Sequence, residues 1–143
     1  MFTIEDTAHS GYYRITGYSN GSDWLLGLND KWPNVRMRGA VGPEHVWLFD
    51  DRSATLHIFH ATERRQVAAL PIGKPNAGTL ISSSRSGRWL YGLVSESISQ
   101  RMLQIIDVTN GRIVSSHDGF PNAHTCPVVE CPDGRLLISF AVR

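Results

Sequence analysis

Apolar residues along this chain come in short runs, and in many of these runs polar and apolar positions alternate. Successive side chains of a β-strand point to opposite faces, so alternation over a short run predicts a strand with one buried face. Glycine, proline, serine and asparagine separate the runs and are typical of turns. The pattern therefore predicts an all-β protein built from short strands.

The runs predict strands in groups of four. The first group is expected at 35–40, 45–50, 55–60 and 65–72, and the second at 78–83, 88–94, 102–108 and 112–117. A third group begins with strands at 123–130 and 135–142, and the chain then stops. Two further strands, at 12–18 and 23–28, precede the first group.

Two segments repeat at a constant offset of 47 residues. Residues 56–67 align with residues 103–114, with Leu, Ile, Thr, Arg and Val identical. At the same offset, residues 84–91 align with residues 131–138, and each of these is a turn followed by an apolar strand. Repeats of this length with short alternating strands predict four-stranded β-propeller blades, each of which buries its faces against its neighbours.

The expected fold is therefore all-β, with about three four-stranded antiparallel blades of propeller type. The two N-terminal strands would supply the two that the third group lacks, giving one blade shared by the N- and C-terminal ends. Such a blade hides two sheet edges that would otherwise invite pairing. Three blades are fewer than a usual ring, so the alternatives are a ring of several copies, an open stack, or a piece of a longer protein.

Three motifs carry a family resemblance. They are Ser-Gly-Arg-Trp-Leu-Tyr at 86–91, Ile-Ile-Asp-Val-Thr-Asn-Gly-Arg-Ile-Val at 105–114 and Cys-Pro-Asp-Gly-Arg-Leu-Leu-Ile at 131–138. Together these resemble the YVTN and WD-repeat-like β-propellers of bacteria, over about two thirds of the chain. The Gly-His and Trp-Asp pairs of a true WD repeat are missing, and the first group reads Gly42-Pro-Glu-His45 at its turn. The resemblance implies an architecture and no particular activity.

Composition narrows the function classes. The 143 residues suit one domain over 1–143, and a net charge of +1 provides no field that would hold a nucleic acid. The N-terminus lacks a signal-peptide pattern, and no apolar run is long enough to span a membrane, so we expect a cytoplasmic protein. Cys126 and Cys131 have neither zinc-ligand spacing nor a partner pair, and we expect two reduced thiols.

Catalytic and metal-binding patterns are weak. Gly17-Tyr-Ser-Asn-Gly21 matches the G-x-S-x-G nucleophile elbow, but a strand rather than a helix is expected after Ser19, which favours a hairpin turn. His57 and His60 lie three apart on an expected strand, so their rings should point to opposite faces and not share a metal. We expect no enzyme activity, no metal and no cofactor.

The candidate binding residues are aromatic and basic. Trp47 and Trp89 lie inside repeat strands and are expected in the core, whereas aromatic residues beside a turn suit a binding surface. Arginine side chains suit contacts with carboxylates, although solvated charges at strand edges explain them as well. The candidate set is Trp24, Trp32, Arg36, Arg38, Arg64 and Arg85.

These features predict a non-catalytic protein-binding module of propeller type, for example a bacterial immunity protein that neutralises a partner toxin. The partner would be another protein or a second copy of the chain. One alternative is a lectin-like oligomer that repeats a tryptophan-lined sugar pocket between blades. Another is a fragment of a larger propeller enzyme.

Overall fold

The computed structural model of the chain describes residues 2–6, 12–17, 23–27, 35, 37–121 and 127–138. Every regular element in these ranges is a β-strand, and every strand pair is antiparallel. The expectation of an all-β protein is confirmed.

The N-terminal sheet has three strands in the order β1-β2-β3, which are β1 (Phe2–Asp6), β2 (Tyr12–Gly17) and β3 (Asp23–Gly27). β1 was not predicted from the sequence. It pairs with β2 over five residue pairs, and Ile4 and Ile15, which face each other in this pairing, are both buried.

Two four-stranded sheets form the centre of the molecule. The first has the order β4-β5-β6-β7 and the second β8-β9-β10-β11, so each strand pairs with its neighbour in the sequence. The strands are β4 (Met37–Val41), β5 (His45–Asp50), β6 (Thr55–His60), β7 (Arg65–Pro71), β8 (Leu80–Ser83), β9 (Trp89–Ser95), β10 (Gln100–Asp107) and β11 (Arg112–Pro121).

A two-stranded hairpin follows, made of β12 (Val129–Glu130) and β13 (Leu136–Leu137). In the described part of the chain, β13 pairs with β12 and with no further strand. Among the described strands, none lies along the second edge of β13, which is called the open edge below.

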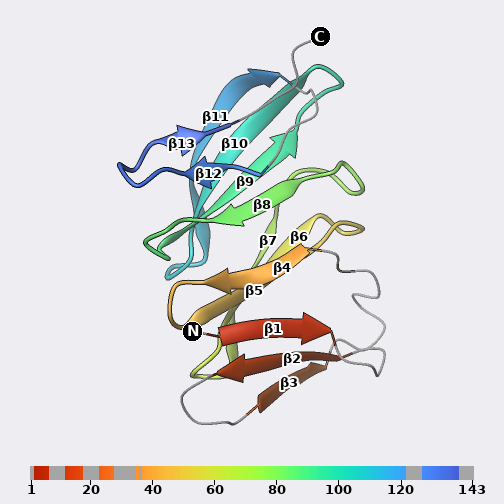
Figure 1. Cartoon of the computed structure of the whole chain (residues 1–143). Coiled ribbons are helices and arrows are strands. Elements are labelled where there is room, and N and C mark those ends of the chain that lie inside the picture. The colour runs from red at the N-terminus through yellow and green to blue at the C-terminus, as the bar shows by residue number, and fades with distance from the viewer. Residues whose placement is uncertain are drawn as a thin grey trace.

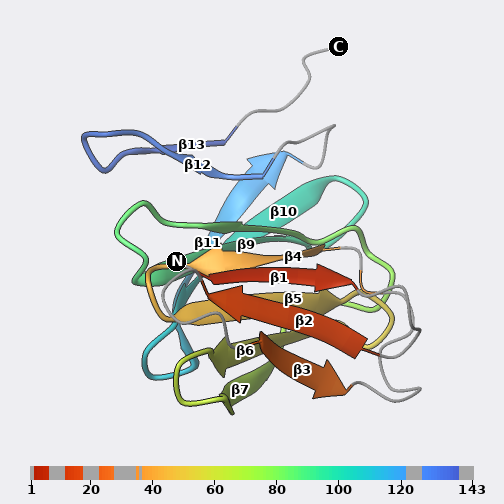
Figure 2. The same cartoon turned by 60° about the horizontal axis from the view of Figure 1, so that its bottom comes forward.

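The four sheets stack face to face in chain order, from β1–β3 at one end to the hairpin at the other (Figure 1). A second view shows β1–β3 lying against the β4–β7 sheet, far from the hairpin (Figure 2). The described sheets do not close into a ring. The described strands do not form the expected blade shared between the two chain ends, because β1, β2 and β3 pair with one another and bury Ile4 and Ile15 against the first four-stranded sheet.

Three apolar layers separate the four sheets. The first layer contains Ile15, Leu48 and Phe59 and lies between β1–β3 and β4–β7. The second lies between the two four-stranded sheets and is the largest, with Phe49, Ile58, Leu90 and Ile106 among its members. The third lies between β8–β11 and the hairpin.

The two four-stranded sheets share detailed geometry. The N–H of Ala61 donates to the carbonyl of Glu44, and the N–H of Val108, 47 residues later, donates to the carbonyl of Arg88. The outer strand of each sheet has a register shift that leaves one residue unpaired as a bulge, Val67 on β7 and Val114 on β11. The β10–β11 pair has a second shift, between Arg101 and Leu103. A β-bulge is a specific feature that bends a strand, so its recurrence at the same offset aligns β6 and β7 with β10 and β11 around the bulge.

No helix in the described ranges is long and apolar enough to cross a membrane.

Candidate functional site

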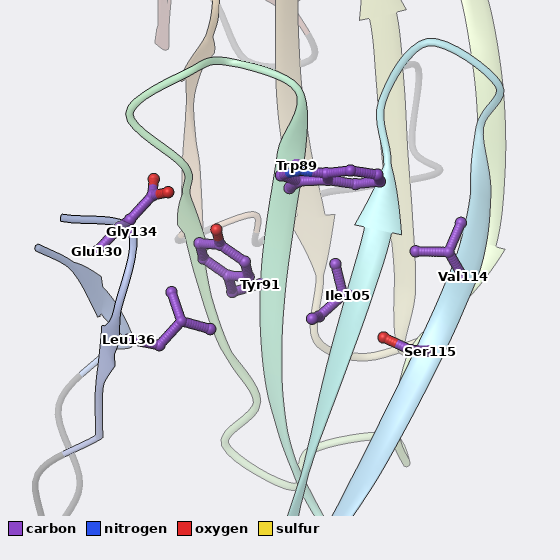
Figure 3. A pocket seen from close by; sticks show the side chains of 8 residues that line it. All are labelled: Trp89, Tyr91, Ile105, Val114, Ser115, Glu130, Gly134 and Leu136. Carbon is purple, nitrogen blue, oxygen red and sulfur yellow. The ribbon is translucent and has the colours of Figure 1, made fainter. Parts of the chain in front are cut away.

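An open groove of about 410 Å³ lies between the second four-stranded sheet and the C-terminal hairpin. Its lining comes from β9, β10 and β11 on one side and from the hairpin on the other (Figure 3). The lining residues are Trp89, Tyr91, Ile105, Val114, Ser115, Glu130, Gly134 and Leu136.

Strand alternation places these side chains. On β9, Leu90 and Val94 point into the layer shared with the first four-stranded sheet, so Trp89 and Tyr91 must point to the other face. On β10, Ile106 belongs to the shared layer and Ile105 faces the groove. The groove floor is therefore the second face of a sheet whose first face is fully covered.

Two hydrogen bonds attach the hairpin to the sheet. The Ser82 hydroxyl donates to the carbonyl of Val128 at 2.6 Å, and the backbone N–H of Arg85 donates to the carboxylate of Glu130. β12 therefore lies along β8, and Leu136 on β13 lies beside Tyr91 of β9 (Figure 3). β10 and β11, the two further strands of the sheet, have no strand of the hairpin above them in the described residues.

The polar groups of the groove are few. Burial, together with the negative charge of Glu130, raises the pKa of the Tyr91 phenol, so this hydroxyl stays protonated at neutral pH and can donate a hydrogen bond. The guanidinium of Arg88 lies over the Trp89 ring, 4.6 Å from its centroid. An apolar floor with a carboxylate and two hydroxyl groups, those of Tyr91 and Ser115, suits binding of a partly apolar group.

Apolar side chains are exposed around the groove. Val114 is 43% exposed at the groove edge, and Leu137 is 59% exposed on the outer side of the hairpin opposite its partner Val129. Single exposed apolar residues are ordinary, but Val114 borders a groove that is itself largely apolar, and apolar surface of this kind is typical of interaction sites.

The structure does not gather the candidate residues from the sequence into one site. Trp24 on β3 packs edge-on against Phe59 in the first apolar layer, with ring centroids 6.0 Å apart. Arg38 on β4 is exposed, with its guanidinium 5.7 Å from the centroid of the Tyr13 ring. Arg64 is exposed in the turn between β6 and β7. Trp32 and Arg36 lie outside the described residues.

Arg85 is the candidate that lies beside the groove. It is exposed in the turn between β8 and β9, and its backbone N–H bonds to the carboxylate of Glu130. Trp47 is in the core as expected, with 5% of its surface exposed, whereas Trp89 is partly exposed and lines the groove. Trp89 is the first residue of β9, beside the turn at 84–88, and its position next to a turn is the signal in the sequence that favours a surface position.

The serine, cysteine and histidine residues considered in the sequence are not among the described residues that line this groove. Ser19 and Cys126 lie outside the described residues. The His57 ring shares a hydrogen bond with the amide of Gln66 at 2.9 Å, whereas the His60 ring packs edge-on against His45. Among the described residues, no group of three or more His, Cys, Asp or Glu side chains could hold a metal ion.

The geometry defines a class of protein, a stack of antiparallel β-sheets with a half-covered face at one end. No protein-family model matches the chain, and no curated protein matches it. A solved structure has a similar fold, a protein of unknown function from Bacteroides caccae, with a TM-score of 0.56 and 11% sequence identity. The match covers 96% of this chain and 49% of that one, so this chain spans about half the length of its structural neighbour.

Proposed function

We propose that this protein is a non-catalytic protein-binding module and that the groove beneath the hairpin holds its partner. The observation that supports this most directly is an apolar groove floor with Val114 exposed at its edge. In the equivalent position of the first four-stranded sheet, Val67 is packed against the core layer. A face that is filled in one sheet and open in the next is suited to a removable partner.

We also infer that the stacked sheets are blades of propeller type. Two features support this, namely four-stranded sheets whose strands pair in sequence order and the equivalent bulges at Val67 and Val114. The motif resemblance to YVTN and WD-repeat-like propellers supports it too. Propellers often serve as binding scaffolds, and this association adds weight to the binding class without defining a partner.

A toxin neutralised by this chain is the partner class favoured from the sequence. The groove is compatible with such a role because it combines apolar area with a carboxylate at Glu130, so a partner would bring an apolar segment and a hydrogen-bond donor. A net charge of +1 means that attachment would depend on shape and burial more than on long-range attraction.

The test compares captures from a lysate of the source organism. Immobilised wild-type protein, Val114→Arg and the control Ile98→Arg are used in parallel, since Ile98 is 97% exposed in the turn between β9 and β10 and does not line the groove. We expect one protein to be retained at about 1:1 by the wild type and the control and to be reduced about tenfold or more by Val114→Arg. Equal retention by all three, or no retained protein, would overturn the proposal.

A carbohydrate ligand is the second candidate. Trp89 and Tyr91 share the groove with the Glu130 carboxylate and the Ser115 hydroxyl, which is a set of groups that can stack on a sugar and bond its hydroxyls. The repeated pocket expected for a lectin is not matched in the first four-stranded sheet, where Trp47 is buried. Titration with a panel of monosaccharides, followed by tryptophan fluorescence and compared with Trp89→Ala, would separate this candidate from protein binding.

A further inference from the structure

The second four-stranded sheet is covered differently on its two faces. Its first face packs against a complete sheet, with Ile106 of β10 and Ile113 of β11 contributing to the shared layer. Its second face packs against Val128, Leu136 and Ile138 from the hairpin region. Within the described ranges, the layer that covers this second face thus has two strands, whereas the layer that covers the first four-stranded sheet has four.

The interface between the two four-stranded sheets indicates which part of the second face lacks a covering strand among those described. Gly111, in the turn between β10 and β11, sits so close to β7 that a Cβ added to it would lie 2.7 Å from the Cβ of Ala68 and 3.1 Å from Cγ1 of Val67. The β10–β11 hairpin therefore covers the bulge residue of the first sheet. Val114 is the bulge residue of the second sheet, and it is exposed at the groove.

The position of the β12–β13 hairpin also indicates that β10 and β11 are the strands that the described chain leaves without cover. Val128, the residue before β12, accepts a hydrogen bond from Ser82 of β8, and β13 carries Leu136 beside Tyr91 of β9. Two more strands in the same order would lie over β10 and β11, beginning at the open edge of β13. Sheets in this chain add strands antiparallel to their neighbours, so the next strand would pair antiparallel with β13.

We propose that the groove binds a β-hairpin of the partner protein, which pairs with the open edge of β13 and completes the last sheet to four strands. This inference rests on the proposed function, since it names the part of the partner that the groove holds. Main-chain hydrogen bonds to β13 supply affinity, and apolar side chains placed over Ile105 and Val114 supply specificity.

The chain's own β10–β11 hairpin occupies the equivalent position over the first four-stranded sheet, so its features indicate those expected of the partner segment. It carries Ile106 and Ile113 on the face that packs against the preceding sheet. Its turn has Gly111 at a φ of 63°, where a Cβ would collide with the sheet below. The partner hairpin therefore has inward-facing apolar residues near its turn and a glycine in the turn itself.

The probe is a synthetic, fluorescently labelled peptide with the sequence of residues 100–121, which contains β10, β11 and their turn. Its binding to the full chain is followed by fluorescence anisotropy, and hydrogen exchange is measured on the β13 amides. We expect saturable 1:1 binding and slower exchange at Leu136 and Leu137. The affinity should fall about tenfold or more with Val114→Arg in the protein or Ile106→Asp in the peptide, and should be unchanged with Ile98→Arg in the protein.

Several results would overturn the inference. They are no saturable binding, binding that is insensitive to Val114→Arg, or faster exchange in the protein's own β10 and β11, which would mean that the peptide displaces them. If the protein dimerises without the peptide, and hydrogen exchange at β13 slows as the protein concentration rises, a second copy of the chain occupies the β13 edge instead.

The two proposals fail in different ways. If the lysate partner is lost with Val114→Arg while the peptide does not protect β13, the binding module stands and the hairpin inference falls. If the peptide protects β13 and no lysate protein distinguishes the variants, strand addition is possible at this edge and the proposed function falls.

Discussion

The two faces of the β8–β11 sheet come from the same strands, yet they have different neighbours. One face meets a complete four-stranded sheet in a layer that includes fully buried Leu90 and Ile106. The other meets a two-stranded hairpin and leaves a groove over Ile105 and Val114. Both faces carry apolar residues, so the difference in burial follows from what covers each face in the described structure.

The largest contrast is expected between Leu90 and Leu137, which are 47 residues apart in aligned strands. Leu90→Ala should lower the free energy of unfolding by about 2–5 kcal/mol, because it leaves a cavity between two complete sheets. Leu137→Ala should cost about 0.5 kcal/mol or less, because the side chain is mostly exposed. Urea denaturation followed by tryptophan fluorescence measures both, and similar losses would refute the difference in cover.

The turns give the next contrast. Gly87 has a φ of 78°, and a Cβ built on it would lie 2.3 Å from the Cα of Gly42 in the turn between β4 and β5. Gly87→Ala should therefore cost about 2–4 kcal/mol, through overpacking as well as backbone strain. Gly134, the matching residue in the hairpin turn, has a φ of 88° and open space around its Cβ position.

Gly134→Ala is the matched control, since backbone strain alone should cost it about 1–2 kcal/mol. Thermal and urea unfolding of the two variants would show whether the close contact of Gly87 adds to that strain. Equal destabilisation would mean that the contact between the turns of the two four-stranded sheets contributes little.

A smaller effect is expected at Asp107, which holds the turn that covers Val67. Its carboxylate accepts hydrogen bonds from the backbone N–H groups of Thr109 and Asn110 and from the Asn110 side chain. Burial by itself would raise the pKa of Asp107, but these bonds and the charge of Arg88 together hold the pKa below its ordinary value. Asp107→Ala should cost about 1–2 kcal/mol at neutral pH.

The pH dependence follows from the direction of that shift. A carboxyl whose pKa is lower in the folded state binds fewer protons there than in the unfolded chain. Its contribution is therefore complete above the ordinary aspartate pKa of about 3.9 and is lost as the pH falls through the lower folded-state value. Unfolding free energies measured between neutral and acidic pH should converge for the wild type and Asp107→Asn, and a constant difference would contradict this.

The smallest effect concerns the attachment of the hairpin. Ser82→Ala removes the hydroxyl that donates to the Val128 carbonyl, with an expected cost of about 1 kcal/mol. Because the hairpin has two strands and lies at one end of the stack, losing this hydrogen bond should speed hydrogen exchange at Val129 and Glu130. The free energy of global unfolding should be almost unchanged. Faster exchange throughout β9 and β10 would instead show that the hairpin unfolds together with the sheet beneath it.

Much of the central fold could be predicted from alternation and turn residues. The expected strands at 45–50 and 55–60 coincide with β5 and β6, because compact runs between Gly, Pro, Asp and Ser residues leave little room for another register. The offset of 47 holds for β6 and β7 against β10 and β11. Backbone bonds align Glu44 with Arg88, an offset of 44, because β9 and β10 are longer than β5 and β6 by one and two residues.

The ends of the chain were harder to predict. A constant offset predicts that Leu137 is buried as Leu90 is, but the hairpin turn is one residue shorter. Cys131 bonds to Arg135, whereas Ser84 bonds to Trp89. A shift of one residue exchanges the two faces of a strand, so Leu136 faces the groove and Leu137 faces outward. Pairing among the first three strands likewise depends on tertiary packing that local pattern does not reveal.

The pairing of each described strand with its immediate neighbour in sequence also bears on how the chain folds. Every sheet can close through short turns, so the entropy lost in bringing strands together is small for an all-β protein. During synthesis the first sheets can form before the last strands emerge from the ribosome. We expect folding to proceed sheet by sheet from the N-terminus, with the C-terminal hairpin as the last element to gain protection and the first to lose it.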